Sequence, residues 1–199
     1  MKVTKAQAQA NRTHVVETAS TLFRERGFDG VGIADLMAAA GLTHGGFYKH
    51  FGSKVDLMAE SAACGIAQTA ALSADAGVEQ IVHLYLSRAH RDARATGCTM
   101  AALGGDAARQ PAVVRATFAE GIEQLLAALG AQEMQREGYD AGHDAGPARA
   151  RSVAILAQMI GALVMSRACP DDSPLADEIL ALCRTDILAS LASSPAAMP

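Results

Sequence analysis

Apolar residues recur at helical spacing along most of the chain, and this periodicity restricts the fold more than any other feature of the sequence. In residues 11–26 the apolar positions fall on one stripe of a helix: Val15, Ala19, Leu22 and Phe23. The sequence has no strand-like alternation of useful length, and aromatic residues, which favour strands, make up only 4% of its 199 residues. The sequence therefore predicts an all-α protein.

Glycine and proline residues divide this helical pattern into short elements at the N-terminal end and longer ones beyond it. The short helices are predicted at 11–26, 33–40 and 43–51. A polar loop is expected at 136–146, and the longer helices are predicted at 53–71, 78–95, 100–109, 111–134, 147–167 and 174–191. We expect about nine helices in two domains. These are a helix-turn-helix domain at 1–55 and a larger helical domain at 56–199, with a linking helix at 53–71.

The charges are distributed unevenly between these two parts. Residues 1–55 contain seven Lys and Arg against four Asp and Glu, whereas residues 56–199 contain ten against seventeen. The whole chain has a net charge of −4, so its overall charge hides a basic N-terminal segment. We therefore expect any contact with a polyanion to be made by the N-terminal segment.

Cysteine usage and apolar stretches indicate the compartment. The four cysteines are scattered without a pairing pattern, which is typical of reduced thiols in a cytoplasmic protein. The first twenty residues lack the apolar core of a signal peptide. The longest apolar stretch, Val153–Met165, is shorter than the ~18–20 residues that span a bilayer. We expect a soluble cytoplasmic protein that makes no membrane contact.

Residues 27–54 have the layout of a helix-turn-helix motif, in which a glycine-containing turn joins two short helices. Phe47 and Phe51 are four residues apart and can pack inward together. Hydrogen-bonding and cationic side chains are then left to face outward, as base edges and phosphates require: Thr43, His44, Tyr48, Lys49 and His50. Lys54 follows in the first turn of the next helix, where backbone N–H groups also favour a phosphate.

Residues 12–60 resemble the DNA-binding domain of TetR-type (tetracycline repressor) transcriptional regulators. The matching pieces, in order, are Leu22-Phe23, Gly27-Phe28, Ile33–Leu36, Ala40–Thr43, Phe47–Phe51 and Ser53-Lys54. The resemblance covers about a quarter of the chain in detail, and the remainder matches only in length, helical content and order. It implies a dimeric regulator that binds double-stranded DNA.

The resemblance also assigns DNA-contact positions to individual residues. The positions that approach bases are His44, Gly45, Gly46, Tyr48 and Lys49, and those that commonly touch the backbone are Thr43, Tyr48, His50 and Lys54. Gly32 occupies a helix-cap position that is usually Ser or Thr, so it retains only its backbone N–H for such a contact. Gly45 and Gly46 carry no side chains, and base readout is therefore expected from His44, Tyr48 and Lys49.

The predicted helix at 147–167 carries two apolar stripes, so we expect it to be buried on two sides. One side is assigned to the core and the other to a partner subunit, with the last helix completing a four-helix interface, as the resemblance also implies. The interface residues are Leu156, Ile160, Leu163, Val164, Ile179 and Leu182. Burial of both stripes inside one subunit is the alternative.

The resemblance further implies a pocket for an unidentified small-molecule effector among the middle helices. Its candidate residues are Tyr85, Arg88, Cys98, Met100, Phe118 and Met159, each of which could instead be ordinary core or surface. Cys98 follows a glycine at a break between predicted helices, and Arg94 could favour its thiolate. A chemical-sensing role for Cys98 is therefore one hypothesis, and a small core residue is the other.

Catalysis, metal binding and a cofactor are not expected. The sequence contains no zinc-protease, nucleophile-elbow or phosphate-loop motif. His83 and His90 are seven residues apart, about 10 Å along a helix, which is too far to ligate one metal ion directly. The resemblance implies a repressor that a small molecule releases from a palindromic operator, and the sequence leaves an activator as the alternative within DNA binding. The other alternative is a helical dimeric interaction protein that does not bind operator DNA.

Overall fold

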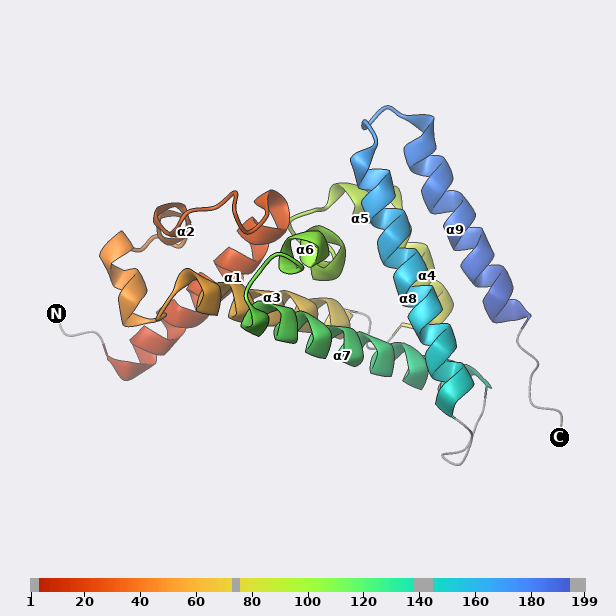
Figure 1. Ribbon diagram of the computed structural model, residues 1–199, viewed down its shortest axis with the longest axis horizontal. Helices are drawn as coiled ribbons and strands as arrows, with labels where there is room; N and C mark the ends of the chain where they lie inside the picture. The colour runs from red at the N-terminus through yellow and green to blue at the C-terminus, as the bar shows by residue number, and fades with distance from the viewer. Residues whose placement is uncertain (1–3, 73–75, 138–144, 194–199) are drawn as a thin grey trace. The chain divides into compact units, whose positions relative to one another are not determined.

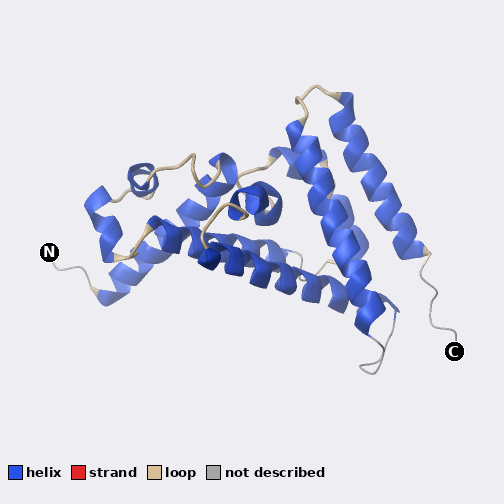
Figure 2. Cartoon of the chain, in the orientation of Figure 1, coloured by secondary structure: helices blue, strands red, loops and turns tan. Residues whose placement is uncertain are grey.

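A computed structural model describes residues 4–72, 76–137 and 145–193, and every regular element in those ranges is a helix (Figure 2). There are nine α-helices and one 3₁₀ helix in the described ranges. In chain order they are α1 (Lys5–Arg26), α2 (Ile33–Ala39), the 3₁₀ helix η1 (His44–Lys49), α3 (Lys54–Leu72), α4 (Val78–Tyr85), α5 (Arg88–Asp92), α6 (Thr99–Ala107), α7 (Ala112–Glu137), α8 (Ala145–Ala168) and α9 (Pro174–Ala192). The predicted all-α fold is confirmed.

The single helix predicted at 78–95 is wrong, because the chain there forms α4 and α5 with a break at Leu86 and Ser87. The Ser87 hydroxyl donates to the Leu84 carbonyl at 2.7 Å and accepts from the backbone N–H of His90 at 3.2 Å. A serine that caps a new helix in this way competes with continuation of the old one. Of the loop predicted at 136–146, residues 138–144 lie outside the described residues.

The chain divides into two compact units, each described here by itself. Unit 1 comprises residues 1–69 and 94–121, and unit 2 comprises residues 70–93 and 122–199. The predicted domain boundary lay at residue 55, whereas unit 1 also includes most of α3, all of α6 and the first part of α7.

Unit 1 is built around three phenylalanine rings. The Phe28 ring lies edge-on to Phe23, with centroids 5.2 Å apart, and to Phe118, with centroids 6.5 Å apart. All three residues are buried. The backbone N–H of Phe28 also donates to the carboxylate of Asp106 on α6 at 3.2 Å. The turn after α1 is thereby attached to α6, which packs against α1.

Unit 2 is dominated by α8 and α9, which run side by side (Figure 1). Leu156 and Leu163 of α8 are buried in the protomer, together with Met159 of the second apolar stripe. The protomer's own core thus covers Leu156 and Leu163, which the sequence pattern assigns to a dimer interface. Both stripes of α8 were apolar, so periodicity could not determine which positions this core takes.

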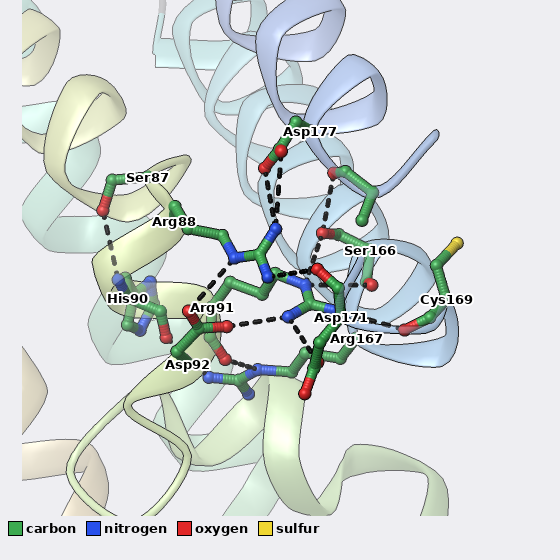
Figure 3. A network of polar contacts seen from close by, with 11 residues as sticks. Ser87, Arg88, His90, Arg91, Asp92, Ser166, Arg167, Cys169, Asp171 and Asp177 are labelled. Carbon is green, nitrogen blue, oxygen red and sulfur yellow. Dashed lines mark hydrogen bonds and ion pairs between the residues drawn. The ribbon is translucent and has the colours of Figure 1, made fainter. Parts of the chain in front are cut away.

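Arg91 of α5 holds this short helix against the connection between α8 and α9 (Figure 3). Arg91 is only 1% exposed. The guanidinium Nε donates to the carbonyl and hydroxyl of Ser166 at 3.1 Å each, and Nη2 donates to the Cys169 carbonyl at 3.0 Å. Nη1 pairs with the carboxylates of Asp92 at 2.7 Å and Asp171 at 2.9 Å. These hydrogen bonds to carboxylates raise the pKa of Arg91.

Candidate nucleic-acid interface

The interface residues are positioned by α2, η1 and the turn between them. α2 ends at Ala39, and Gly41 follows with a φ of 68°, a left-handed conformation that glycine adopts without strain. The backbone N–H of Leu42 then donates to the Met37 carbonyl at 2.8 Å, which closes the turn. The chain leaves this turn at Thr43 and enters η1 directly.

At the start of α2, the carboxylate of Asp35 accepts a hydrogen bond from the backbone N–H of Gly32 at 3.2 Å. This is half of a capping box, in which the third helical residue reaches back to the cap. The expectation that the Gly32 N–H is available to a DNA phosphate needs correction, since Asp35 occupies it. The three-residue spacing of Gly32 and Asp35 was the sequence signal for this contact.

The inward side of η1 is aromatic. Phe47 and Phe51 are buried, with ring centroids 5.4 Å apart. Tyr48 lies edge-on to Phe47 at 5.1 Å and is 64% exposed. The phenol ring is therefore supported at one edge while its hydroxyl is free to reach a partner outside the protein.

Five of the predicted contact residues are exposed on or beside η1: Thr43, His44, Gly45, Tyr48 and Lys49. Gly46 and His50 are half-buried. A β-carbon at Gly46 would lie 3.5 Å from the Met37 methyl group, so this glycine faces α2, whereas a β-carbon at Gly45 would meet nothing within 4 Å. Gly45 is thus the glycine that leaves room for a base edge to approach the backbone.

Lys54 differs from its predicted role. It is half-buried, its ammonium donates to the Phe28 carbonyl at 2.6 Å, and it lies over the Phe23 ring at 5.8 Å. A buried carbonyl and an aromatic face together form a favourable site for an ammonium group. The assignment of Lys54 as an exposed phosphate contact is corrected to a residue that holds the start of α3 to the turn after α1.

Arg12 is a positioning residue that the sequence reasoning missed. Its guanidinium pairs with the Glu60 carboxylate at 2.5 Å, donates to the His50 carbonyl at 3.4 Å, and lies over the Phe51 ring at 4.9 Å. These contacts fix the end of η1 between α1 and α3. The basic charge of Arg12 was visible in the sequence, but its partners are 38 to 48 residues away and give no local signal.

The candidate effector residues belong to both units. Cys98, Met100 and Phe118 are buried in unit 1, and Tyr85 and Met159 are buried in unit 2. Arg88 of unit 2 is half-exposed and pairs with Asp92 at 3.1 Å and Asp177 at 3.2 Å, so its donors are engaged within the protein. The side chain of Cys98 is not at the surface, since the residue is only 2% exposed.

The remaining predicted interface residues lie at the surface of unit 2. Val164 and Leu182 are exposed, and Ile160 and Ile179 are half-buried. No group of three or more His, Cys, Asp or Glu residues able to hold a metal ion occurs among the described residues. One described helix, Gly146–Ala168, is long and apolar enough to cross a membrane by length and composition alone. Packing against α9 accounts for part of this apolar character.

Comparison with known proteins supports the same reading of the N-terminal region. Residues 15–60 match the family model of bacterial regulatory proteins of the tetR family. The transcriptional regulator AcrR of Shigella flexneri is 39% identical over 57 residues, which cover 29% of this chain and 26% of AcrR. The transcriptional repressor DhaR of Mycobacterium sp. (strain GP1) is 46% identical over 43 residues, 22% of each chain. The matches thus span about a quarter of these relatives' length.

Solved structures match over nearly the whole chain. A TetR transcriptional regulator from Chloroflexus aurantiacus J-10-FL superposes with a TM-score of 0.68 and 25% identity, over 94% of this chain and 97% of that one. The reduced form of E. coli NemR superposes with a TM-score of 0.70 and 19% identity, over 89% and 95% of the two chains. The superposition on NemR shows that the two proteins share a fold.

A short helix that presents polar side chains beyond a glycine turn, in an all-α chain, defines a helix-turn-helix DNA-binding protein. Together with this layout, the matched segment at residues 15–60 and the shared fold support a transcriptional regulator of the TetR family of bacterial regulatory proteins. The proteins of this family are regulators of transcription and not enzymes.

Proposed function

We propose that the protein is a cytoplasmic transcriptional repressor that binds a palindromic operator as a homodimer and is released by a small-molecule effector. The observation that carries this proposal is the exposed face of η1, where Tyr48, Lys49 and their neighbours are supported from behind by buried Phe47. Two such faces on a symmetric dimer would enter successive major grooves. The basic charge of residues 1–55 suits the same contact.

We propose base contacts for His44, Tyr48 and Lys49, with the Gly45 backbone close to the groove and Thr43 and His50 beside the phosphates. His44 and Tyr48 carry both donor and acceptor atoms, whereas Lys49 is a point charge that suits guanine or phosphate oxygens. Gly32, Gly46 and Lys54 are engaged inside the domain and have at most a positioning role.

Effector release requires a ligand that binds one conformation of the dimer better than the other. We propose that the buried side chains of Tyr85 and Met159 in unit 2, or of Met100 and Phe118 in unit 1, are where an apolar effector binds. A screen of small molecules for stabilisation of the protein, followed by release of bound operator, tests this proposal. Compounds that stabilise the protein without changing operator affinity would contradict it.

The DNA contact is tested with an operator selected from random sequence and checked against the DNA that flanks the gene. We expect Tyr48→Ala and Lys49→Ala each to weaken operator binding by about 1–3 kcal/mol, and Lys49→Ala to lower the salt dependence by about one neutralised phosphate. Binding is measured by fluorescence anisotropy at several salt concentrations, with circular dichroism to confirm that each variant is folded.

Arg115→Ala is the matched control. Arg115 is an exposed cation of α7, so its replacement changes the net charge as Lys49→Ala does but lies outside η1. Operator affinity that falls equally in all three variants would show only a general charge effect. If wild-type protein selects no DNA sequence, the helical interaction protein is the better interpretation.

A further inference from the structure

A cluster of buried polar side chains lies in unit 1, outside the nucleic-acid interface and separate from the Arg91 contacts of unit 2. It consists of Ser20 and Arg24 on α1 and Thr99 at the first position of α6, which are 2%, 6% and 1% exposed. Neither the helix-turn-helix contact nor the dimer uses these residues. Because buried polar groups are nearly always paired, such a cluster needs a physical explanation.

The three side chains converge on Gly65 of α3. A β-carbon added to Gly65 would lie 2.5 Å from Thr99 Oγ1 and 2.7 Å from both Arg24 Nη1 and Ser20 Oγ. All three polar atoms therefore face one point on the surface of α3, and a residue larger than glycine would push them away. They are close enough together for a single small atom to contact all three.

The hydrogen bonds within the protein leave these three atoms unused. Ser20 Oγ and Thr99 Oγ1 have no hydrogen-bond partner among the described residues. Arg24 donates from Nε to the Ala95 carbonyl at 2.8 Å and from Nη2 to Gln68 Oε1 at 3.5 Å, whereas Nη1 lies beside the same point of α3 as the two hydroxyls. A guanidinium nitrogen is only a donor, and each hydroxyl can donate as well. Because all three atoms can donate, one hydrogen-bond acceptor can serve the whole cluster.

The electrostatics of the site also favour an acceptor with negative charge. Burial lowers the pKa of Arg24, an effect that the neighbouring Cys64 and Cys98 oppose. Thr99 begins α6, and the preceding side chain of Cys98 does not cap that helix. The first-turn N–H groups of a helix carry partial positive charge, so a buried cation is placed at the positive end of a helix dipole. An anion between them would relieve the repulsion.

We propose that Ser20, Arg24 and Thr99 bind a small inorganic anion, a halide or a compact oxyanion, at the N-terminus of α6 beside Gly65. The anion accepts hydrogen bonds from the guanidinium Nη1 and from both hydroxyls. Its small size follows from the convergence of three buried donors on one point. Bound there, it links α1, α3 and α6 within unit 1.

The proposal is tested by thermal unfolding at constant sodium concentration and ionic strength, with chloride or phosphate replacing gluconate. We expect the midpoint of wild-type protein to rise with the concentration of the bound anion, because a ligand that binds only the folded state stabilises it by mass action. Thr99→Val preserves the side-chain shape, removes one donor, and should flatten this response. Arg24→Gln should abolish it.

Arg26→Gln is the matched control, since Arg26 lies two residues further along α1 and pairs with Glu25 at the surface. It should keep the wild-type response. A rise with phosphate alone identifies an oxyanion, and a rise with chloride identifies a halide. Equal responses in wild type and Thr99→Val, or no response to either anion, would overturn the proposal. If Arg24→Gln does not fold, the anion response of Thr99→Val relative to wild type still tests the proposal.

Crystals grown in bromide or in selenate provide the direct observation. We expect an anomalous peak beside Arg24 Nη1 and within hydrogen-bonding distance of Ser20 Oγ and Thr99 Oγ1. Density at that position without anomalous signal under either condition would identify a water molecule and overturn the anion site.

Discussion

His90 is a titratable group whose environment differs between the folded and unfolded chain. Its imidazole packs edge-on against the Tyr85 ring at 4.6 Å, and its Nδ1 lies 2.8 Å from the Tyr85 carbonyl. Burial lowers the pKa of His90 below its ordinary value of 6.5, an effect that the Tyr85 carbonyl opposes and the charge of Arg167 reinforces. The folded state therefore binds fewer protons at His90 than the unfolded state does as the pH falls below about 6.5.

This difference predicts that the stability contributed at His90 is fully present above pH 6.5 and declines as the pH falls towards the lower folded-state pKa. The free energy of unfolding, measured in urea between pH 7.5 and pH 5.5, should fall more steeply for wild type than for His90→Gln. His83→Gln, at an exposed position on α4, is the matched control for the substitution itself. Identical slopes for wild type and His90→Gln would contradict the assignment.

At the scale of elements, α5 is too short to be stable alone, since isolated helices of fewer than about 12 residues are marginal in water. The Ser87 cap and the Arg91 contacts with Ser166 and Cys169 therefore hold it in place. We expect Arg91→Leu to destabilise the protein by about 1–3 kcal/mol for each buried acceptor left without a donor. Arg88→Leu, which removes exposed ion pairs with Asp92 and Asp177 and an exposed hydrogen bond to the Asp171 carbonyl, should have a much smaller effect.

Chemical denaturation followed by circular dichroism measures both variants. Equal stability of Arg91→Leu and wild type would show that α5 is held by packing alone. Asp171→Asn gives a further check, because the Asp171 carboxylate is exposed and should matter less than the two backbone carbonyls.

The elements also show which parts of the fold could be predicted from sequence. Most helix ends were predictable because caps and glycine turns are local, as at Gly27 and Gly41, both of which adopt a positive φ. The aromatic inner side of η1 was predictable from the spacing of Phe47 and Phe51. The contacts of Lys54 and Arg12 were not predictable, because their acceptors lie far away in the sequence and depend on tertiary packing.

At the scale of the whole molecule, the exposed large apolar residues of unit 2 gather on α8 and α9. Five of the seven such residues described in this unit lie on these two helices, namely Val153, Val164, Met165, Leu175 and Leu182, and the other two are Leu84 and Ile122. We propose that a second copy of the same two helices covers these residues by two-fold symmetry, because gathered exposed apolar side chains commonly mark an interaction site. The proposed face includes the predicted Val164 and Leu182 and the half-buried Ile160 and Ile179, whereas Leu156 and Leu163 are buried within the protomer.

The proposed dimer predicts that Leu182→Arg separates the subunits without unfolding them. Leu182 is 62% exposed, so the charged side chain remains solvated in the monomer but would be buried without a partner in the dimer. Leu84→Arg is the matched control, since Leu84 is 60% exposed on α4 and lies outside the α8–α9 face. Light scattering should give monomer mass for Leu182→Arg and dimer mass for wild type and Leu84→Arg.

Operator affinity should fall steeply only in the monomeric variant, because it loses simultaneous contact with two half-sites. A stable dimer of Leu182→Arg would place the interface elsewhere.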